Sequence, residues 1–297
     1  MALSIERKST IITSATAFLL SIAKFIAGIL TGSMAVITSA IDSLLDMAMS
    51  LFNLFAVKQS ELNPNETFNY GRGKIEGLAA LFEGILIALS GAFIIYQSAR
   101  NLIDEKAIGD LGAAIWAMIF SIVVTSCLII GLTTALKKTN SLILKADLLH
   151  YKSDLWTNIG IIVSLGLIAL SGWHFIDGMI SIAIAIFILF GAFKIMREGV
   201  LTLLDRAIEE PLLSAICAII KKAPLVKSYH SLRTRKSAKT YIIDVHLVFN
   251  DDISLIEAHD SSDFVENAIA ALEPNAKWLI TVHLDPKDDS QENNSTG

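Results

Sequence analysis

The chain has 297 residues, of which 53% are hydrophobic and 18% charged, and its mean hydropathy is +0.58. This composition is too apolar for a soluble protein of this length and indicates several membrane spans. The net charge of −5 argues against nucleic acid as a partner, and the two cysteines provide neither a disulfide framework nor a thiolate metal site.

Apolar runs long enough to cross a bilayer, which takes about 20 residues, fill the first part of the chain. There are six, over residues 11–31, 34–57, 77–99, 111–136, 142–170 and 176–196. The first run follows two basic residues as a secretory signal would, but it is long and further spans follow. We therefore expect an uncleaved first helix in a bundle of six transmembrane helices.

The basic residues predict the orientation of this bundle. Most lie at the N-terminus and in alternate loops, namely Arg7, Lys8, Lys58, Arg72, Lys74, Lys137, Lys138, Lys194 and Arg197. The opposite loops hold Arg100 and Lys106. By the positive-inside rule we expect a multi-pass protein of the cell (inner) membrane with both termini in the cytoplasm.

The second run carries two carboxylates four residues apart, Asp42 and Asp46. On a helix they share one face, one turn apart, and like charges at this spacing repel. Each Asp near the bilayer centre also costs roughly 2.5–3.5 kcal/mol. A cation between the two groups would offset both penalties, so the pair predicts half of an intramembrane cation site. The structural alternative is an ion pair with Lys24 or Lys152.

The fifth run repeats this spacing with His150 and Asp154. Together with Asp42 and Asp46 they supply three carboxylates and one imidazole, a ligand set that suits tetrahedral Zn²⁺. The absence of Cys and Met from the set disfavours Cu⁺ and leaves Fe²⁺, Mn²⁺, Co²⁺ and Cd²⁺ open. Metal binding needs ionised carboxylates and a neutral imidazole, so protons and metal compete for these groups.

After Asp205 the pattern becomes that of a soluble domain. We predict helices and strands in the order α-β-β-α-β, over residues 209–222, 226–235, 239–249, 253–272 and 277–284. Pro211 falls in the first turn of the first helix. This order predicts a small cytoplasmic α+β domain with both helices on one side of the sheet.

The chain thus divides into a transmembrane domain over residues 1–206, a cytoplasmic domain over 207–286 and a disordered tail over 287–297. Four histidines lie in the cytoplasmic domain: His230, His246, His259 and His283. His283 and Asp285 are two apart on a predicted strand and share one face. From the residues alone, ordinary surface histidines are a competing interpretation.

Several motifs carry a family resemblance: SAIDSLLD in the second run, NYGRGKIEGLAAL after it, LLHYKSDLW, LLDR, HSLRTRKSAKT and EAHD. Over residues 11–286 the chain resembles the cation diffusion facilitator family, and it is similar to the bacterial zinc and iron exporters. The resemblance implies a homodimeric antiporter that exchanges a cytoplasmic divalent metal for protons. Zn²⁺ is the expected substrate, with Fe²⁺, Cd²⁺ and Mn²⁺ as alternatives. The matching transport site is Asp42, Asp46, His150 and Asp154.

The resemblance also implies a metallochaperone-like cytoplasmic domain with a binuclear, structural or regulatory zinc site that helps to join two copies. The matching residues are His230, His246, His283 and Asp285, with His259 bridging or supporting. Lys74 and Asp205 match a charge pair that acts as a hinge in the family, although Lys74 alone is equally well explained as a basic anchor.

One loop departs from the family pattern, which has an Asp and two His there as a further metal site. Asn65, Phe68 and Arg72 stand at these positions, and an Arg cannot bind a cation as a ligand. We predict no metal in this loop.

Two other functions compete with metal antiport. An intramembrane metal-dependent hydrolase would also bury His and Asp, but it needs an open metal position and a general base, and the HExxH motif is absent. A membrane-anchored metal sensor would leave the paired acids of the membrane runs unexplained. We therefore expect a transporter and not an enzyme.

Overall fold

The computed structural model describes the backbone of residues 4–31, 34–104, 112–171, 173, 175–274 and 276–288. Within these ranges it describes most side chains, but not those of residues 20, 23–24, 27–31, 34–43, 101–104, 112–118, 165 and 169. The chain forms two compact units, Met1–Val200 and Leu201–Gly297. The predicted tail falls largely on residues 289–297, which lie outside the described part.

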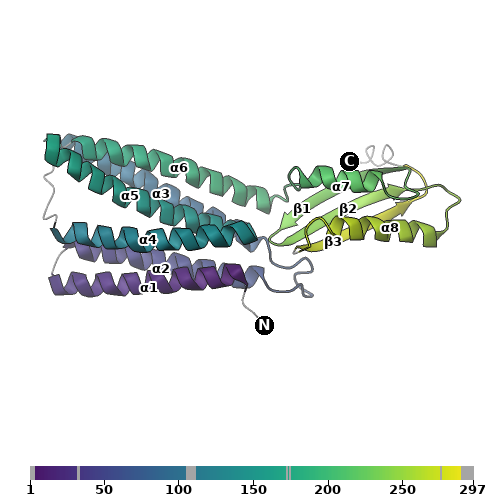
Figure 1. Cartoon of the computed structure of the whole chain (residues 1–297), viewed down its shortest axis with the longest axis horizontal. Helices are drawn as coiled ribbons and strands as arrows, with labels where there is room; N and C mark the ends of the chain where they lie inside the picture. Colours follow the sequence, from purple (N-terminus) through teal and green to yellow (C-terminus); the bar gives the residue numbers. More distant parts are fainter. Residues whose placement is uncertain are drawn as a thin grey trace. The chain divides into compact units, whose positions relative to one another are not determined.

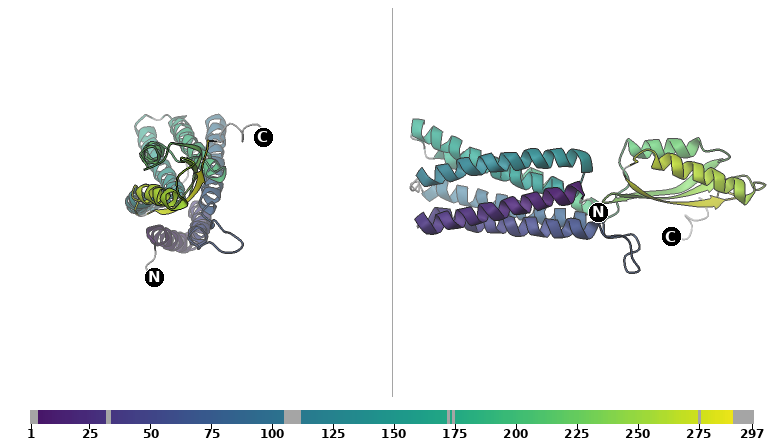
Figure 2. Two further views of the ribbon diagram at one scale, coloured as in Figure 1. Left: turned by 90° about the vertical axis from the view of Figure 1, so that its right-hand side faces the viewer. Right: turned by 60° about the horizontal axis from the view of Figure 1, so that its bottom comes forward.

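Long α-helices make up the first unit and run side by side (Figures 1 and 2). They are α1 (Ile5–Thr31), α2 (Met34–Ser60), α3 (Ile75–Asp104), α4 (Gly112–Thr139), α5 (Leu142–Ser171) and α6 (Phe175–Leu203). Each contains the described part of one predicted apolar run and extends beyond it into polar residues. With 27 to 30 residues, each helix is about 40–45 Å long.

Three of these helices are both long and apolar enough to cross a membrane within the described residues: Ile75–Arg100 in α3, Ile119–Thr139 in α4, and α6. The six predicted spans therefore stay a prediction. The fifth helix is equally long, but its first half carries four charged residues, Lys145, Asp147, Lys152 and Asp154.

The surface of this unit is strongly apolar. Leu170 is 88% exposed, Phe190 73% and Leu89 61%. Large apolar side chains exposed along whole helices are unfavourable in water and favourable against lipid tails. The exposed apolar surface therefore supports a helical membrane domain.

Glycines allow α3 and α6 to approach closely. A Cβ atom at Gly199 of α6 would lie 2.7 Å from the carbonyl oxygen of Gly77 in α3, and one at Gly84 would lie 2.7 Å from Met196. Close backbone approach through small residues is a common way to pack helices in lipid, where the hydrophobic effect between helices is weak.

The second unit has the predicted order of elements. It consists of α7 (Leu212–Lys221), β1 (Ser228–Ser237), β2 (Thr240–Val248), α8 (Leu255–Ala270) and β3 (Lys277–Asp285). The sheet order is β1-β2-β3, with β1 antiparallel and β3 parallel to β2. Both helices cover the same face of the sheet (Figure 2).

The first helix of this unit begins later than predicted. It starts at Leu212, and Pro211 is its N-cap residue and does not lie in the first turn. A proline disfavours helical backbone in the residue before it, here Glu210. The second helix, in contrast, begins at a capping box in which Ser254 and Glu257 exchange hydrogen bonds. These bonds lower the pKa of the exposed Glu257 carboxyl.

Alternation along β2 separates the core of this unit from its open face. Ile243, Val245 and Leu247 are at most 1% exposed and pack against α7 and α8. The residues between them, including Asp244 and His246, point to the face that no helix of this unit covers.

Candidate metal centres

Two neighbouring helices bring three of the predicted transport-site residues together. His150 Nε2 on α5 lies 3.1 Å from Asp46 Oδ1 on α2 and 3.7 Å from Asp154 Oδ2, one turn further along α5. One ligand atom from each residue lies within 4.8 Å of the other two. Asp42 is one turn before Asp46 on α2, but its side chain lies outside the described residues. The arrangement provides two carboxylates and an imidazole that converge on one point.

This cluster is partly accessible, with side chains 23% (His150), 33% (Asp46) and 39% (Asp154) exposed. The edge of the Tyr151 ring packs against the His150 ring, with 5.5 Å between their centroids. Of the two lysines that could have paired with Asp46, Lys152 is exposed, and the side chain of Lys24 lies outside the described residues. The described partner of Asp46 is instead a potential metal ligand on another helix.

The structure contains a second polar cluster in this unit, which was not predicted from the sequence. Asn53 on α2, Glu83 on α3 and Asp147 on α5 are 0%, 2% and 2% exposed. Asn53 Nδ2 donates to Glu83 Oε2 at 2.9 Å and to Asp147 Oδ1 at 2.7 Å. No local spacing joins these residues, because each comes from a different helix. The available signal was Asp147 itself, an acid one turn before His150 inside an apolar run.

The second unit aligns three of its histidines in one row across the sheet. His246 on β2 is the register partner of both His230 on β1 and His283 on β3. Register partners point to the same face. The ring centroids are 4.8 Å apart for His230 and His246 and 4.6 Å apart for His246 and His283.

Asp285, two residues after His283, contacts all three imidazoles. Asp285 Oδ2 lies 2.8 Å from His246 Nδ1 and 3.2 Å from His230 Nε2, and Oδ1 lies 3.0 Å from His283 Nε2. The Asp285 side chain is only 10% exposed. Three nitrogen donors around one carboxylate form a set that metals such as Zn²⁺ prefer.

His259 is not brought into this row within the chain. It lies on α8, which packs on the opposite face of the sheet, and its side chain is 67% exposed beside Asp263, at 3.9 Å. Its supporting role stays a prediction.

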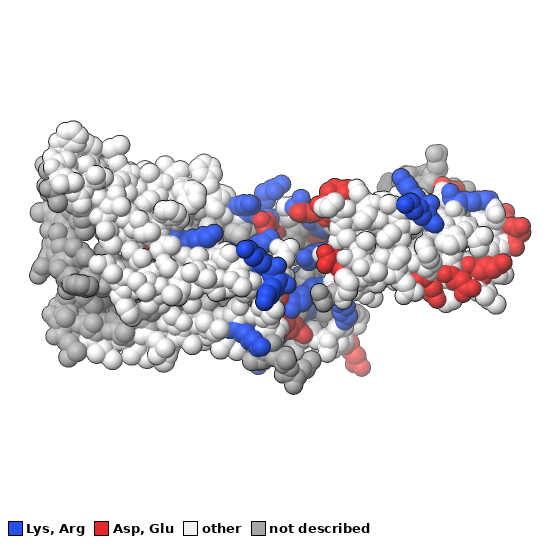
Figure 3. Space-filling model, viewed as in Figure 1, with Lys and Arg blue, Asp and Glu red and all other residues white. Residues whose placement is uncertain are grey.

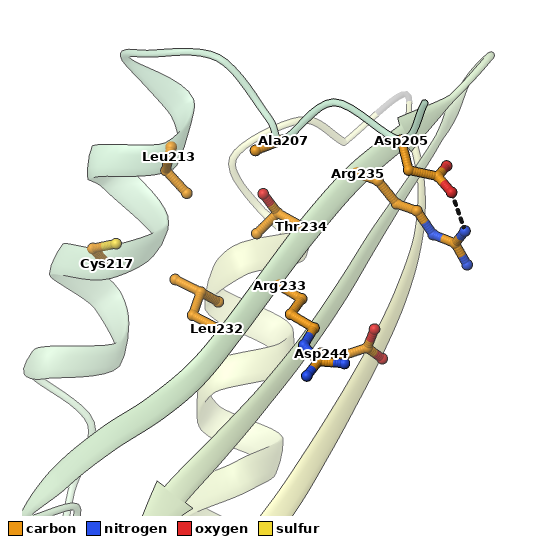
Figure 4. A pocket seen from close by; sticks show the side chains of 9 residues that line it. All are labelled: Asp205, Ala207, Leu213, Cys217, Leu232, Arg233, Thr234, Arg235 and Asp244. Atoms are coloured by element: carbon orange, nitrogen blue, oxygen red, sulfur yellow. Dashed lines mark hydrogen bonds and ion pairs between the residues drawn. The ribbon is translucent and has the colours of Figure 1, made fainter. Parts of the chain in front are cut away.

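Asp205 forms an ion pair with the first strand of the second unit, β1. Arg235 Nη1 donates to Asp205 Oδ2 at 3.0 Å, and the Ile208 N–H donates to Thr234 Oγ1 at 3.1 Å. Asp205, Thr234 and Arg235 border a pocket of about 580 Å³ beside α7 (Figure 4). The predicted pairing of Asp205 with Lys74, which belongs to the other unit, stays a prediction.

In the loop between α2 and α3, the residues at the positions of the family's further metal site contact one another and the end of α2. Asn65 Oδ1 accepts from the backbone N–H of Phe68 at 2.8 Å, and the Arg72 guanidinium stacks over the Phe68 ring at 4.4 Å. Arg72 also donates to Gln59 Oε1 at 2.8 Å. A guanidinium among these side chains would repel a cation.

Comparison with known proteins finds a family match for each of the two units. Residues 10–204 match the family described as "Cation efflux transmembrane domain", and residues 208–287 match "Cation efflux protein, cytoplasmic domain". The chain is also similar to the "Cation-efflux pump FieF" of Salmonella agona and of Salmonella newport. Each is 36% identical over 279 residues, which cover 94% of this chain and 92% of the relative.

Proposed function

Because the chain belongs to the cation efflux, or cation diffusion facilitator, family, we propose that it exports a divalent transition metal from the cytoplasm in exchange for protons. The observation that carries this proposal is the meeting of Asp46, His150 and Asp154 between α2 and α5. Zn²⁺ is the substrate that best fits this mixture of oxygen and nitrogen donors, and Asp42 completes the site as a fourth ligand.

Exchange with protons follows from the chemistry of these ligands. An ion binds to the imidazole only when the metal-binding nitrogen carries no proton, and the carboxylates bind it only when ionised. Metal arriving from the cytoplasm therefore displaces protons, and protons arriving from the opposite side displace the metal. All the donors are used by the ion, which favours transport over hydrolysis of a substrate.

In this proposal all six long helices cross the membrane, and both termini are cytoplasmic. On the visible face of the helical unit, Lys and Arg gather towards one end, and most of the described surface elsewhere is uncharged (Figure 3). Lys58 lies in the last turn of α2, and Lys137 and Lys138 lie in the last turn of α4. Basic residues at the same end of alternate helices are typical of the cytoplasmic side.

The cytoplasmic unit in turn binds zinc at His230, His246, His283 and Asp285 and joins two copies of the chain. This proposal is supported by the row of imidazoles around one carboxylate on the open face of the sheet. Such a site is structural or regulatory, because it lies outside the membrane helices.

Transport into proteoliposomes tests the main proposal. We expect the wild-type protein to move Zn²⁺ when a pH gradient is applied and Asp154→Asn to lose at least about tenfold in rate, since loss of even an outer hydrogen-bond partner of a metal ligand costs about 10- to 100-fold in affinity. Asp177→Asn is the matched control, because Asp177 on α6 hydrogen-bonds to Ser164 and is not among the ligands. Zinc flux that needs no pH gradient and survives Asp154→Asn would refute antiport at this site.

A further inference from the structure

The buried cluster of Asn53, Glu83 and Asp147 contains two carboxyl groups, and the hydrogen bonds from Asn53 alone do not offset two negative charges. One amide group donates to one oxygen of each carboxyl group. Among the described residues, no hydrogen-bond donor reaches the other buried oxygens, Glu83 Oε1 and Asp147 Oδ2, or Asn53 Oδ1. A buried carboxylate that lacks donors on one oxygen is strongly destabilised in its ionised form.

The two carboxyl groups are also neighbours, because the same Asn53 nitrogen donates to both, at 2.9 and 2.7 Å. Ionised carboxylates only accept hydrogen bonds, so a bond between them requires a proton. Two neighbouring carboxyl groups in a medium of low dielectric share one proton and titrate as a pair. The geometry therefore describes a pair that carries a proton when no other cation is near.

This pair is separate from the transport-site ligands but lies close to them along the same helices. Asp147 precedes His150 by three residues on α5, and Asn53 follows Asp46 by seven residues on α2. Neither carboxyl group belongs to the set of ligand atoms that converge on His150. His150 interacts electrostatically with both of them.

A polar contact between the same two helices lies near both clusters. Ser50 Oγ on α2 and Tyr151 Oη on α5 are 3.3 Å apart, and Ser50 lies between Asp46 and Asn53 along α2. His150 on α5 acts electrostatically on both carboxyl groups, and Asp46 on α2 and Asp154 on α5 act on His150. Through His150, a charge placed at the transport site acts on the pair.

We propose that Glu83 and Asp147, bridged by Asn53, bind one exchangeable proton that leaves for water when a divalent metal binds at Asp46, His150 and Asp154. This inference rests on the proposed function. The two positive charges of the metal, a short distance along α5, favour two ionised carboxylates, and departure of the metal favours their reprotonation. The pair thereby adds a proton to those displaced from the metal ligands themselves.

The number of protons released per zinc ion tests the proposal. Calorimetric titration of the full-length protein with Zn²⁺ at one pH, in buffers of different ionisation enthalpy, gives this number. We expect Glu83→Gln to bind as much zinc per chain as the wild type but to release about one proton fewer per ion bound at the transport site. Asp147→Asn carries the same expectation and replaces Glu83→Gln if that variant does not fold.

Glu76→Gln is the matched control, because Glu76 is a buried acid on the same helix whose Oε1 accepts from Ser141. We expect its proton release to equal that of the wild type. An unchanged proton count in Glu83→Gln overturns the inference, and so does a lower zinc stoichiometry, which would make the pair a metal site. If Asp154→Asn binds and transports zinc like the wild type, the proposed function itself fails. An unchanged proton count in Glu83→Gln alone leaves that function standing.

Discussion

At the scale of single residues, Asp285 is the group that brings the three histidines of the sheet together. Its two oxygens face one imidazole from each strand of the sheet, at 2.8 to 3.2 Å. The sequence predicted that His283 and Asp285 share a face, because two residues apart on a strand means the same side. The family resemblance grouped His230 and His246 with them, but the residue pattern alone could not place all three histidines in one row, because that depends on the pairing register.

Asp285→Asn should strip zinc from the cytoplasmic site. The amide cannot supply the charge that holds a dication among three neutral imidazoles, so we expect a loss of at least about tenfold in affinity. The measurement is zinc retained per full-length chain after equilibrium dialysis, in an Asp154→Asn background that removes the transport site.

Asp244→Asn is the control for this change, since Asp244 is exposed on the same face of β2. Equal zinc retention by Asp285→Asn and Asp244→Asn would show that the row of histidines is an ordinary surface feature.

At the scale of elements, the sequence predicted which segments form helices and strands. How these elements pair and pack could be predicted only in part. Length and apolar character predicted the helices of the membrane unit, and alternation predicted β2. The pairing of β1 with β2 shifts between His230 and Arg233, where Ser231 has a positive φ of 51°. No turn-forming residue such as Gly or Pro marks this bulge, so no local pattern could predict it.

The contact between α3 and α6 gives a prediction at this scale. In Gly199→Ala the new Cβ would lie 2.7 Å from the backbone oxygen of Gly77, and a backbone atom cannot rotate away. The two helices must separate, which should cost about 1–3 kcal/mol and lower the unfolding temperature of the detergent-solubilised protein.

Gly131→Ala in α4 is the matched control, because no described atom lies within 4 Å of the position that a Cβ atom would take there. It should keep or slightly raise stability, since Ala is the better helix former by about 1 kcal/mol. Equal unfolding temperatures for the two variants would show that α3 and α6 are not tightly packed at Gly199.

At the scale of the whole molecule, the site residues that could be predicted from the sequence lie close together along one helix. Those that were missed meet only through tertiary packing. His150 and Asp154 form a local pair on one helix, and each membrane acid is conspicuous in an apolar run. The cluster of Asn53, Glu83 and Asp147 exists only because three helices pack together. Such sites need the tertiary structure, since helix packing in lipid leaves no simple pattern in one sequence.

The predicted orientation of the chain in the membrane, with both termini in the cytoplasm, can be tested by labelling. In a background without Cys127 and Cys217, a membrane-impermeant maleimide should label Trp173→Cys on intact cells and Glu209→Cys only after the membrane is opened. Both positions are well exposed, Trp173 at 61% and the Glu209 side chain at 68%. The reverse labelling pattern would place the termini outside and contradict the positive-inside argument.

The order of the strands along the chain has a consequence for biosynthesis. His283 and Asp285 belong to β3, the last of the described strands along the chain, whereas His230 and His246 are made earlier. Because chains emerge from their N-terminus, the donors of the sheet are complete only after β3 has been made. A nascent chain that stops before β3 lacks both the ladder of hydrogen bonds between β2 and β3 and the carboxylate at its end.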